Sequence, residues 1–178
     1  YVDAWKRKDT AESVRIYRTA MDSAPPFLQA VRQKDVTEAR RLLLEDPNNA
    51  CLVEEVTGYT ALMMAAAQDD TEMMRLLLDA PGTEVNHVTA IGVTALSLAS
   101  DKGHAACVKL LLAAPGMDVN CDNIEDETAL KAAAGLRHLS IVRLLLTAPT
   151  VDITLRDESG RTARDIAAQK GHTQIVRA

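Results

Sequence analysis

Aromatic residues are scarce in this 178-residue chain, which contains three tyrosines, one tryptophan and one phenylalanine, or 3 % in all. A core with so few rings must be filled by small and medium side chains, and this favours closely packed helices. No apolar run approaches the roughly 18 residues that a membrane-spanning helix requires. The composition therefore predicts a protein that does not insert into a membrane.

Cysteine is also scarce, and the net charge of the chain is negative. The three cysteines are an odd number without CxxC spacing, which predicts free thiols in a reducing compartment. We therefore expect a cytoplasmic location, with the nucleus as an alternative. The formal net charge of −5 and the isoelectric point of about 5.4 argue against a nucleic-acid partner held by its phosphates.

Motifs for catalysis and cofactor binding are missing from the sequence. It has no Gly-x-Ser-x-Gly, P-loop, dinucleotide-binding or HExxH pattern, so we expect neither an enzyme nor a cofactor. His104, His138 and His172 invite a metal interpretation, but they recur at one constant step along the chain. If each belongs to one of several stacked units roughly 10 Å apart, they are too distant to share a zinc ion. We therefore expect structural histidines and no metal site.

The sequence contains an internal repeat. Three independent markers each recur every 34 residues. Leu-Leu-Leu begins at Leu42, Leu76, Leu110 and Leu144. Thr-Ala begins at Thr60, Thr94, Thr128 and Thr162. Prolines follow the leucines at Pro47, Pro81, Pro115 and Pro149. The chain is therefore predicted to be a solenoid of units of this one length.

One unit, residues 92–120, predicts two helices and an extended loop. Thr94 can cap a short helix of small residues that ends near Asp101, where Gly103 supplies a positive φ. A second helix is expected from Ala105 to Ala113, with its apolar side chains on one stripe. Pro115 and Gly116 stop that helix before the chain returns to the next unit.

The order TALxxA, GH, VxLLL and DVN resembles the ankyrin repeat, whose familiar form is GxTPLHxAAxxGHxxxVxxLL followed by DVN. The resemblance covers residues 26–178 and implies an all-α solenoid of stacked helix pairs joined by extended loops. We expect an array over 25–178 with units at 25–57, 58–91, 92–125, 126–159 and an incomplete 160–178. Because the chain opens on Tyr1 and ends inside the last unit, we expect a longer polypeptide.

The sequence departs from the family pattern at two kinds of position. Met63, Ser97, Lys131 and Asp165 stand where the family usually has histidine, so the family's Thr–His hydrogen bond cannot form. Thr162 and Asp165 can form a capping box instead. Asp69 and Arg137 replace the helix-ending glycine, so those turns are either strained or differently closed.

Residues 1–24 lack the repeat markers. Val14, Tyr17 and Met21 fall at helical spacing and predict an extra amphipathic helix. This helix either caps the first unit or is the remnant of a preceding helical repeat, because the stretch is similar to the second helix of a tetratricopeptide unit.

The resemblance implies a protein-interaction module that binds a protein or peptide on its concave side, made of loop tips and first helices. The alternative is a structural spacer or scaffold segment within a larger protein or assembly. Residues 51–130 carry 13 acidic side chains against three basic ones, so we expect a partner with apolar residues flanked by Lys or Arg. Carried over position by position, the candidate contact residues are Tyr59, Met63, Gln68, Ile91, Val93, Ser97, Lys102, Ile124, Glu127, Lys131 and Arg161.

Overall fold

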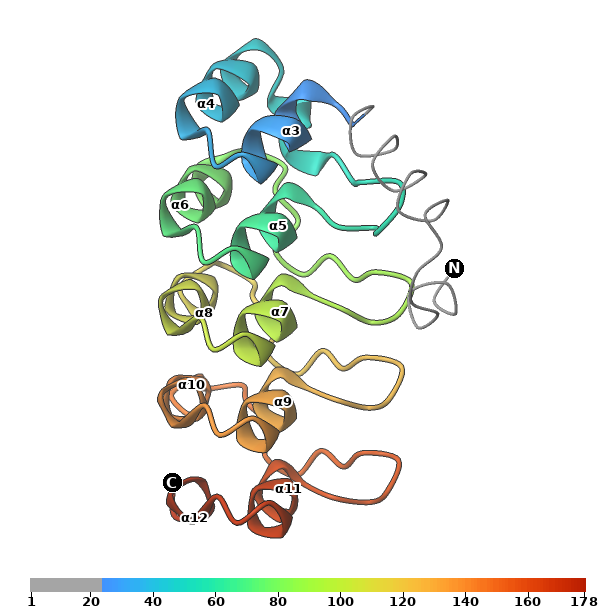
Figure 1. Ribbon diagram of the computed structural model, residues 1–178, viewed down its shortest axis with the longest axis vertical. Helices are drawn as coiled ribbons and strands as arrows, with labels where there is room; N and C mark the ends of the chain where they lie inside the picture. Colours follow the sequence, from blue (N-terminus) through green and yellow to red (C-terminus); the bar gives the residue numbers. More distant parts are fainter. Residues whose placement is uncertain (1–23) are drawn as a thin grey trace, which may run out of the picture.

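The computed structural model describes residues 24–178, which form a single stack of helix pairs (Figure 1). The helix predicted over 1–24 falls, apart from Ala24, outside the described residues. The first helices of the pairs are α3 (Pro26–Arg32), α5 (Ala61–Ala67), α7 (Ala95–Asp101), α9 (Ala129–Gly135) and α11 (Ala163–Gln169). The second helices are α4 (Val36–Glu45), α6 (Thr71–Asp79), α8 (Ala105–Leu112), α10 (Leu139–Leu145) and α12 (Thr173–Val176).

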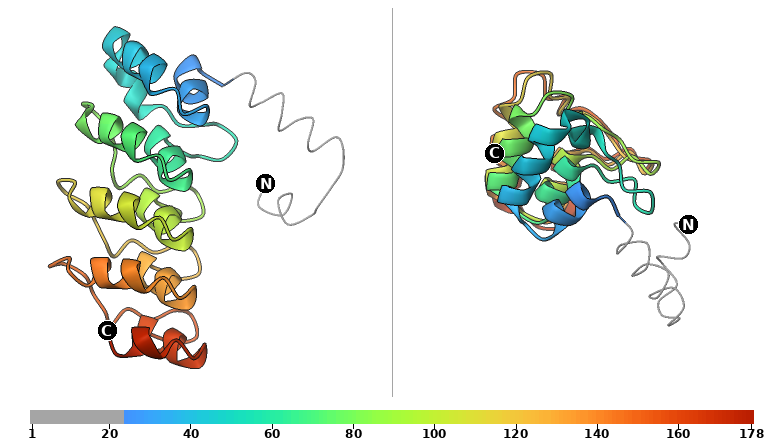
Figure 2. Two further views of the ribbon diagram at one scale, coloured as in Figure 1. Left: turned by 60° about the vertical axis from the view of Figure 1, so that its left-hand side comes forward. Right: turned by 90° about the horizontal axis from the view of Figure 1, so that it is seen from above.

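The two sets of helices form two parallel columns, and the loops between pairs project to one side (Figures 1 and 2). A short 3₁₀ helix, η1 (Pro47–Cys51), follows α4. Two isolated bridges, Val53 with Thr60 and Asp122 with Thr128, are the only β pairing within residues 24–178. The predicted all-α solenoid is confirmed. None of the helices described is long and apolar enough to cross a membrane.

The first helices can stack closely because their buried positions hold mainly alanine. Ala65, Ala99, Ala133 and Ala167 occupy the same place in successive units and are completely buried. Each helix of this set after α3 begins at a threonine whose hydroxyl oxygen accepts a hydrogen bond from the backbone N–H three residues later. The predicted capping box of Thr162 with Asp165 is present, and Thr94 forms a second one with Ser97.

The turn between the two helices of a pair has a left-handed residue in every unit. This residue is glycine in two units, but it is Lys34, Asp69 and Arg137 in the other three, at φ 60°, 56° and 66°. The same backbone bond closes each turn, as from the Asp70 N–H to the Ala65 carbonyl at 3.0 Å. The alternative of a differently closed turn is therefore wrong for Asp69 and Arg137.

Side-chain hydrogen bonds join neighbouring units at two levels. His104, His138 and His172 each donate from a ring nitrogen to a carbonyl of the preceding unit, at 2.8 to 3.0 Å. In the loops, the Asn86 amide donates to the Gly116 carbonyl at 2.7 Å, and the Asn86 side-chain oxygen accepts from the Asp118 N–H at 2.8 Å. Asn120 repeats this pattern one unit later. The histidines therefore have the structural role that the sequence predicts.

The last unit is the least filled part of the stack. The helix α12 has four residues, of which only Ile175 is buried. A hollow of about 660 Å³ opens beside it, lined in part by Val142, Leu146 and Ile153. Ile153 is 58 % exposed, whereas Val119, its equivalent one unit earlier, is 3 % exposed because the next unit covers it.

Candidate functional site

The loops that project beyond the first helices form narrow hairpins whose tips are held by short polar side chains. The Asp157 carboxylate accepts from the backbone N–H groups of Ser159 and Arg161 at 3.0 and 2.8 Å. The Asn123 side chain holds the preceding tip in the same way. The chain reverses at a positive φ, which Asp126 adopts at 54° although it is not glycine. Rigid tips of this kind can hold side chains in a fixed arrangement toward solvent.

The tips of neighbouring units also contact one another. The Ile124 N–H donates to the Ile91 carbonyl at 3.3 Å. Beside it, Gly92 leaves no room for a side chain, because a Cβ there would lie 2.3 Å from the Asn123 Cα. The two tips therefore form one continuous surface.

Two of the predicted contact residues are buried. Met63 is 1 % exposed, and Lys131 is 2 % exposed. The Lys131 ammonium donates to the Asp126 carbonyl at 2.5 Å, so it supports the tip from below. Met63 belongs to the core cluster, whereas Lys131 lies beneath the hairpin that precedes α9. Neither side chain is accessible in this structure, so the candidate surface omits them, and partner contact at these two positions stays an untested prediction.

Four more of the predicted residues are half-buried and already engaged within the array. Tyr59 and Val93 pack against the core, and Ser97 completes the capping box with Thr94. The Gln68 amide donates to the Arg32 carbonyl in the preceding unit at 3.4 Å. These side chains shape the surface and offer a partner only part of their area.

Arg161 lies in the last tip and is bound to its own hairpin. Its guanidinium pairs with Asp157 at 2.7 Å and donates to the Gln169 side chain at 2.8 Å. The hydrogen bond and charge from Arg161 hold the pKa of Asp157 below its ordinary value. To contact another protein, the Arg161 side chain would first have to break its bonds to Asp157 and Gln169.

The remaining predicted residues are available to solvent. Ile124 is 64 % exposed at the tip that precedes α9, Ile91 is half-buried beside it, and Lys102 and Glu127 are exposed. Partial burial raises the pKa of the Glu127 carboxyl, and the negative charges of Asp101 and Glu125 add to the effect. We use the name tip surface for the exposed and half-exposed hairpin residues Glu55, Val56, Val88, Ile91, Ile124, Glu125, Asp126 and Glu127.

Two apolar residues of the tip surface were not among the predicted contact residues. Val56 and Val88 are 37 % and 45 % exposed in the first and second hairpins of the array. Alignment with the repeat places Val56 at a tip, but nothing in the sequence distinguishes an exposed valine from a packed one. The tip surface is therefore more apolar than the sequence predicts.

Two of the three cysteines, Cys107 and Cys121, do not offer reactive thiols. Burial raises the pKa of Cys107 to about 12, with a further contribution from its hydrogen bond to Asp69. Burial also raises the pKa of Cys121 to about 11, assisted by its bond to Asp118. Both thiols therefore stay protonated at neutral pH. Within residues 24–178 no three His, Cys, Asp or Glu side chains are grouped to hold a metal ion.

Comparison with known families identifies the repeat. The family model for ankyrin repeats (3 copies) matches residues 27–123 and 107–178, and so spans all five helix pairs. The chain therefore belongs to the ankyrin-repeat family. Ankyrin repeats are generally protein–protein interaction modules and are typically not enzymes. No curated protein matches the sequence.

Proposed function

We propose that this ankyrin-repeat chain binds a protein or peptide segment on its concave side, with the tip surface as the main contact. A solenoid whose units touch only their neighbours offers an extended face rather than a closed pocket. Such a face suits an elongated partner that contacts several units at once. The absence of catalytic motifs from the sequence is consistent with binding as the whole of its activity.

The observation that carries the proposal is the exposed apolar side chain of Ile124. An isoleucine that is 64 % exposed on a rigid tip forgoes most of the roughly 1.5–3 kcal/mol that full burial would contribute. Val56 and Val88 add apolar area on the preceding hairpins. A partner that covers these side chains recovers that free energy, which gives the surface an apolar anchor.

The charge around Ile124 specifies the partner further. Glu125, Asp126 and Glu127 follow it directly, and all three are exposed. They belong to the stretch 51–130, in which acidic side chains far outnumber basic ones. We therefore propose a partner segment whose apolar residues are flanked by Lys or Arg. Long-range attraction of this kind mainly raises the association rate, so added salt should slow association more than it speeds dissociation.

The test is a single substitution, Ile124→Ser, measured against a partner first isolated with this chain as bait. We expect the binding free energy to weaken by about 1–3 kcal/mol, which raises the dissociation constant roughly 5- to 150-fold. The matched control is Ile153→Ser, which removes the same side chain at 58 % exposure from the hollow beside α12. The control should leave the affinity unchanged.

A change at Ile124 is preferable to one at Val93 because Val93 packs against the core. If Ile124→Ser and Ile153→Ser bind equally well, the tip surface is not the contact. If binding instead requires contacts at the ends of the array and ignores every tip change, the spacer or scaffold alternative is the better description.

A further inference from the structure

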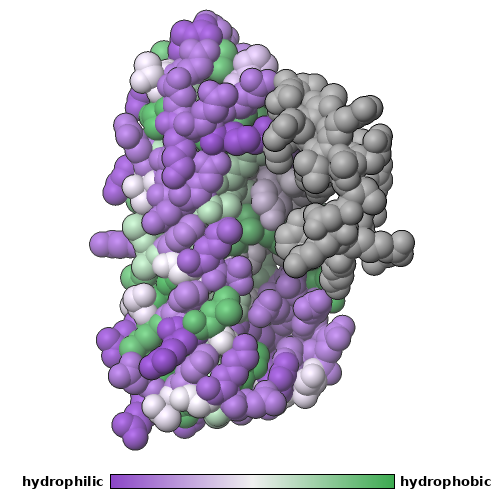
Figure 3. Space-filling model, in the orientation of Figure 1, coloured by the Kyte–Doolittle hydropathy of each residue, from purple (hydrophilic) through white to green (hydrophobic). Residues whose placement is uncertain are grey.

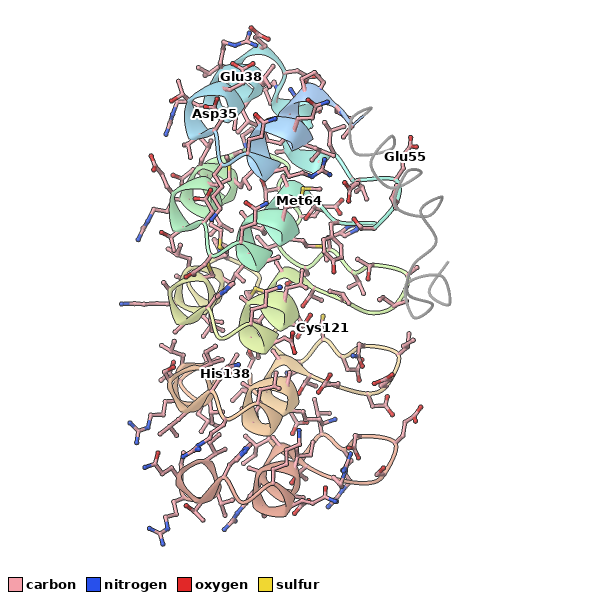
Figure 4. All side chains as sticks on the ribbon, in the orientation of Figure 1. Asp35, Glu38, Glu55, Met64, Cys121 and His138 are labelled. Atoms are coloured by element: carbon pink, nitrogen blue, oxygen red, sulfur yellow. The ribbon has the colours of Figure 1, made fainter. Side chains whose placement is uncertain are left out.

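The second helices carry a column of cations that the proposed function does not use. One exposed basic residue stands at the same place in each unit of the repeat. The five are Arg41, Arg75, Lys109, Arg143 and Arg177. Nitrogen-tipped side chains project along the second-helix edge of the stack (Figure 4), and this edge is mainly hydrophilic (Figure 3). It lies on the other side of the array from the hairpin tips (Figure 1).

The first two cations stand near acidic residues of their own helices, and Arg41 forms ion pairs with two of them. Arg41 pairs with Glu38 at 2.6 Å and also with Glu45. Arg75 has Glu72 three residues before it and Asp79 four residues after it, which are the positions whose side chains meet on a helix surface. An approaching anion therefore meets little uncompensated charge on α4 and α6.

The last three cations have no such neighbours. The positions three and four residues before and after Lys109 hold alanine and leucine. Those around Arg143 hold leucine, serine and threonine, and those before Arg177 hold threonine and glutamine. Lys109, Arg143 and Arg177 form no ion pair with any residue of 24–178, and unlike Arg75 they also have no acidic residue at these positions. We call these three residues the basic column.

We propose that the basic column docks an acidic α-helix of a partner protein, whose carboxylates recur every seven residues. Packed helices lie about 8–10 Å apart, which sets the step from one cation to the next. Seven residues of an α-helix rise about 10.5 Å, so carboxylates at that spacing meet successive cations from one face of the partner helix. This surface is separate from the tip surface and does not depend on it.

The surroundings of the column favour a protein helix over other anions. Ala106, Ser140 and Thr173 lie beside the three cations and are exposed and small, and the large apolar neighbour Leu146 is 36 % exposed and lines the hollow beside α12. Phosphates of a nucleic-acid strand recur about every 3.4 Å, so three cations roughly 10 Å apart match only a fraction of them. The net charge of −5 further opposes a long polyanion.

Two synthetic helical peptides of one composition test the proposal. One carries three glutamates at seven-residue steps, and the other has the same glutamates distributed around the helix. In an NMR titration at low salt, the first should bind about five-fold more tightly and shift resonances of α8 and α10. Salt near 0.3 M, where the Debye length is only about 6 Å, should remove most of the difference.

Charge-reversal variants identify the residues responsible. The double change Lys109→Glu with Arg143→Glu should abolish binding of the first peptide. The control Arg75→Gln removes the charge of an equally exposed residue of the same register and should leave binding within about two-fold, because Glu72 and Asp79 already offset that charge. If the double variant unfolds, Lys109→Gln with Arg143→Gln removes the charges without reversing them.

Three outcomes would overturn the proposal. These are equal affinity for the two peptides, a loss of binding on Arg75→Gln as large as that on Lys109→Gln with Arg143→Gln, and tighter binding to vesicles containing phosphatidylserine than to the first peptide. Ile124→Ser should leave peptide binding unchanged, so a failure here is distinguishable from a failure of the concave-side proposal.

Discussion

Replacing Arg137 by glycine tests the strain in the turn between α9 and α10. Arg137 adopts φ 66°, a conformation that costs an L-residue about 1–2 kcal/mol and costs glycine nothing sterically. Glycine also loses about 0.5–1 kcal/mol more backbone entropy on folding than other residues do. The difference predicts that Arg137→Gly stabilises the fold by a few tenths to about 1 kcal/mol.

The Arg137 side chain does not complicate this estimate. It is exposed and forms no ion pair or side-chain hydrogen bond with any described residue. Urea unfolding followed by circular dichroism at 25 °C measures the change directly. In a thermal scan, about 1 kcal/mol corresponds to a shift in Tm of about 2–4 °C for a chain of this size.

Two companion variants show whether the backbone is responsible. Asp69→Gly should gain less than Arg137→Gly, because the Asp69 carboxylate accepts a hydrogen bond from the Cys107 thiol at 3.3 Å. Gly103→Ala should destabilise, since its Cβ at φ 81° would lie 2.9 Å from the His138 ring. If Arg137→Gly lowers stability, the turn is not strained and the reasoning is refuted.

Burial and charge lead to three more predictions. Leu111→Ala empties a fully buried site on α8 and should cost about 2–5 kcal/mol in urea unfolding, whereas a smaller loss would mean that the neighbouring units collapse into the space. Hydrogen exchange should be fastest after about residue 160, because α12 buries only Ile175, and uniform protection to Ala178 would contradict this. The raised pKa of Glu127 means that the folded state binds its proton more strongly than the unfolded state does, so its contribution to stability falls as the pH rises above the ordinary value of 4.5. Glu127→Gln should therefore stabilise at pH 7 by up to about 0.5 kcal/mol and have less effect at pH 4, and a gain that is larger at pH 4 would show the opposite shift.

The repeat markers predict much of the architecture because they are local signals with direct physical causes. Thr94 and Thr162 cap the helices that follow them, as expected from threonine before a helix-forming run. The first helix of the 92–120 unit ends at Asp101 as predicted, and the second ends at Leu112, one residue earlier than predicted.

The candidate site was harder to predict, because exposure depends on what a neighbouring loop covers. Met63 and Lys131 match positions that can face a partner, yet Met63 packs in the core and Lys131 lies beneath its hairpin. The Lys131 ammonium reaches a carbonyl that only the folded hairpin brings within 2.5 Å. Ile124 was predicted to be a contact residue, but the extent of its exposure was not predictable from apolar character alone.

The sequence by itself determined the repeat length, the helix pairs, the caps and the positions where the chain must turn, since each depends on residues within one unit. Only the tertiary structure decided which side chains remain accessible. Stacking buries Val119 and leaves Ile153 exposed at equivalent positions, because the unit after Val119 has a full second helix, α10, whereas the unit after Ile153 has only the four residues of α12. It also places Lys109, Arg143 and Arg177 at equivalent positions of three consecutive second helices, α8, α10 and α12.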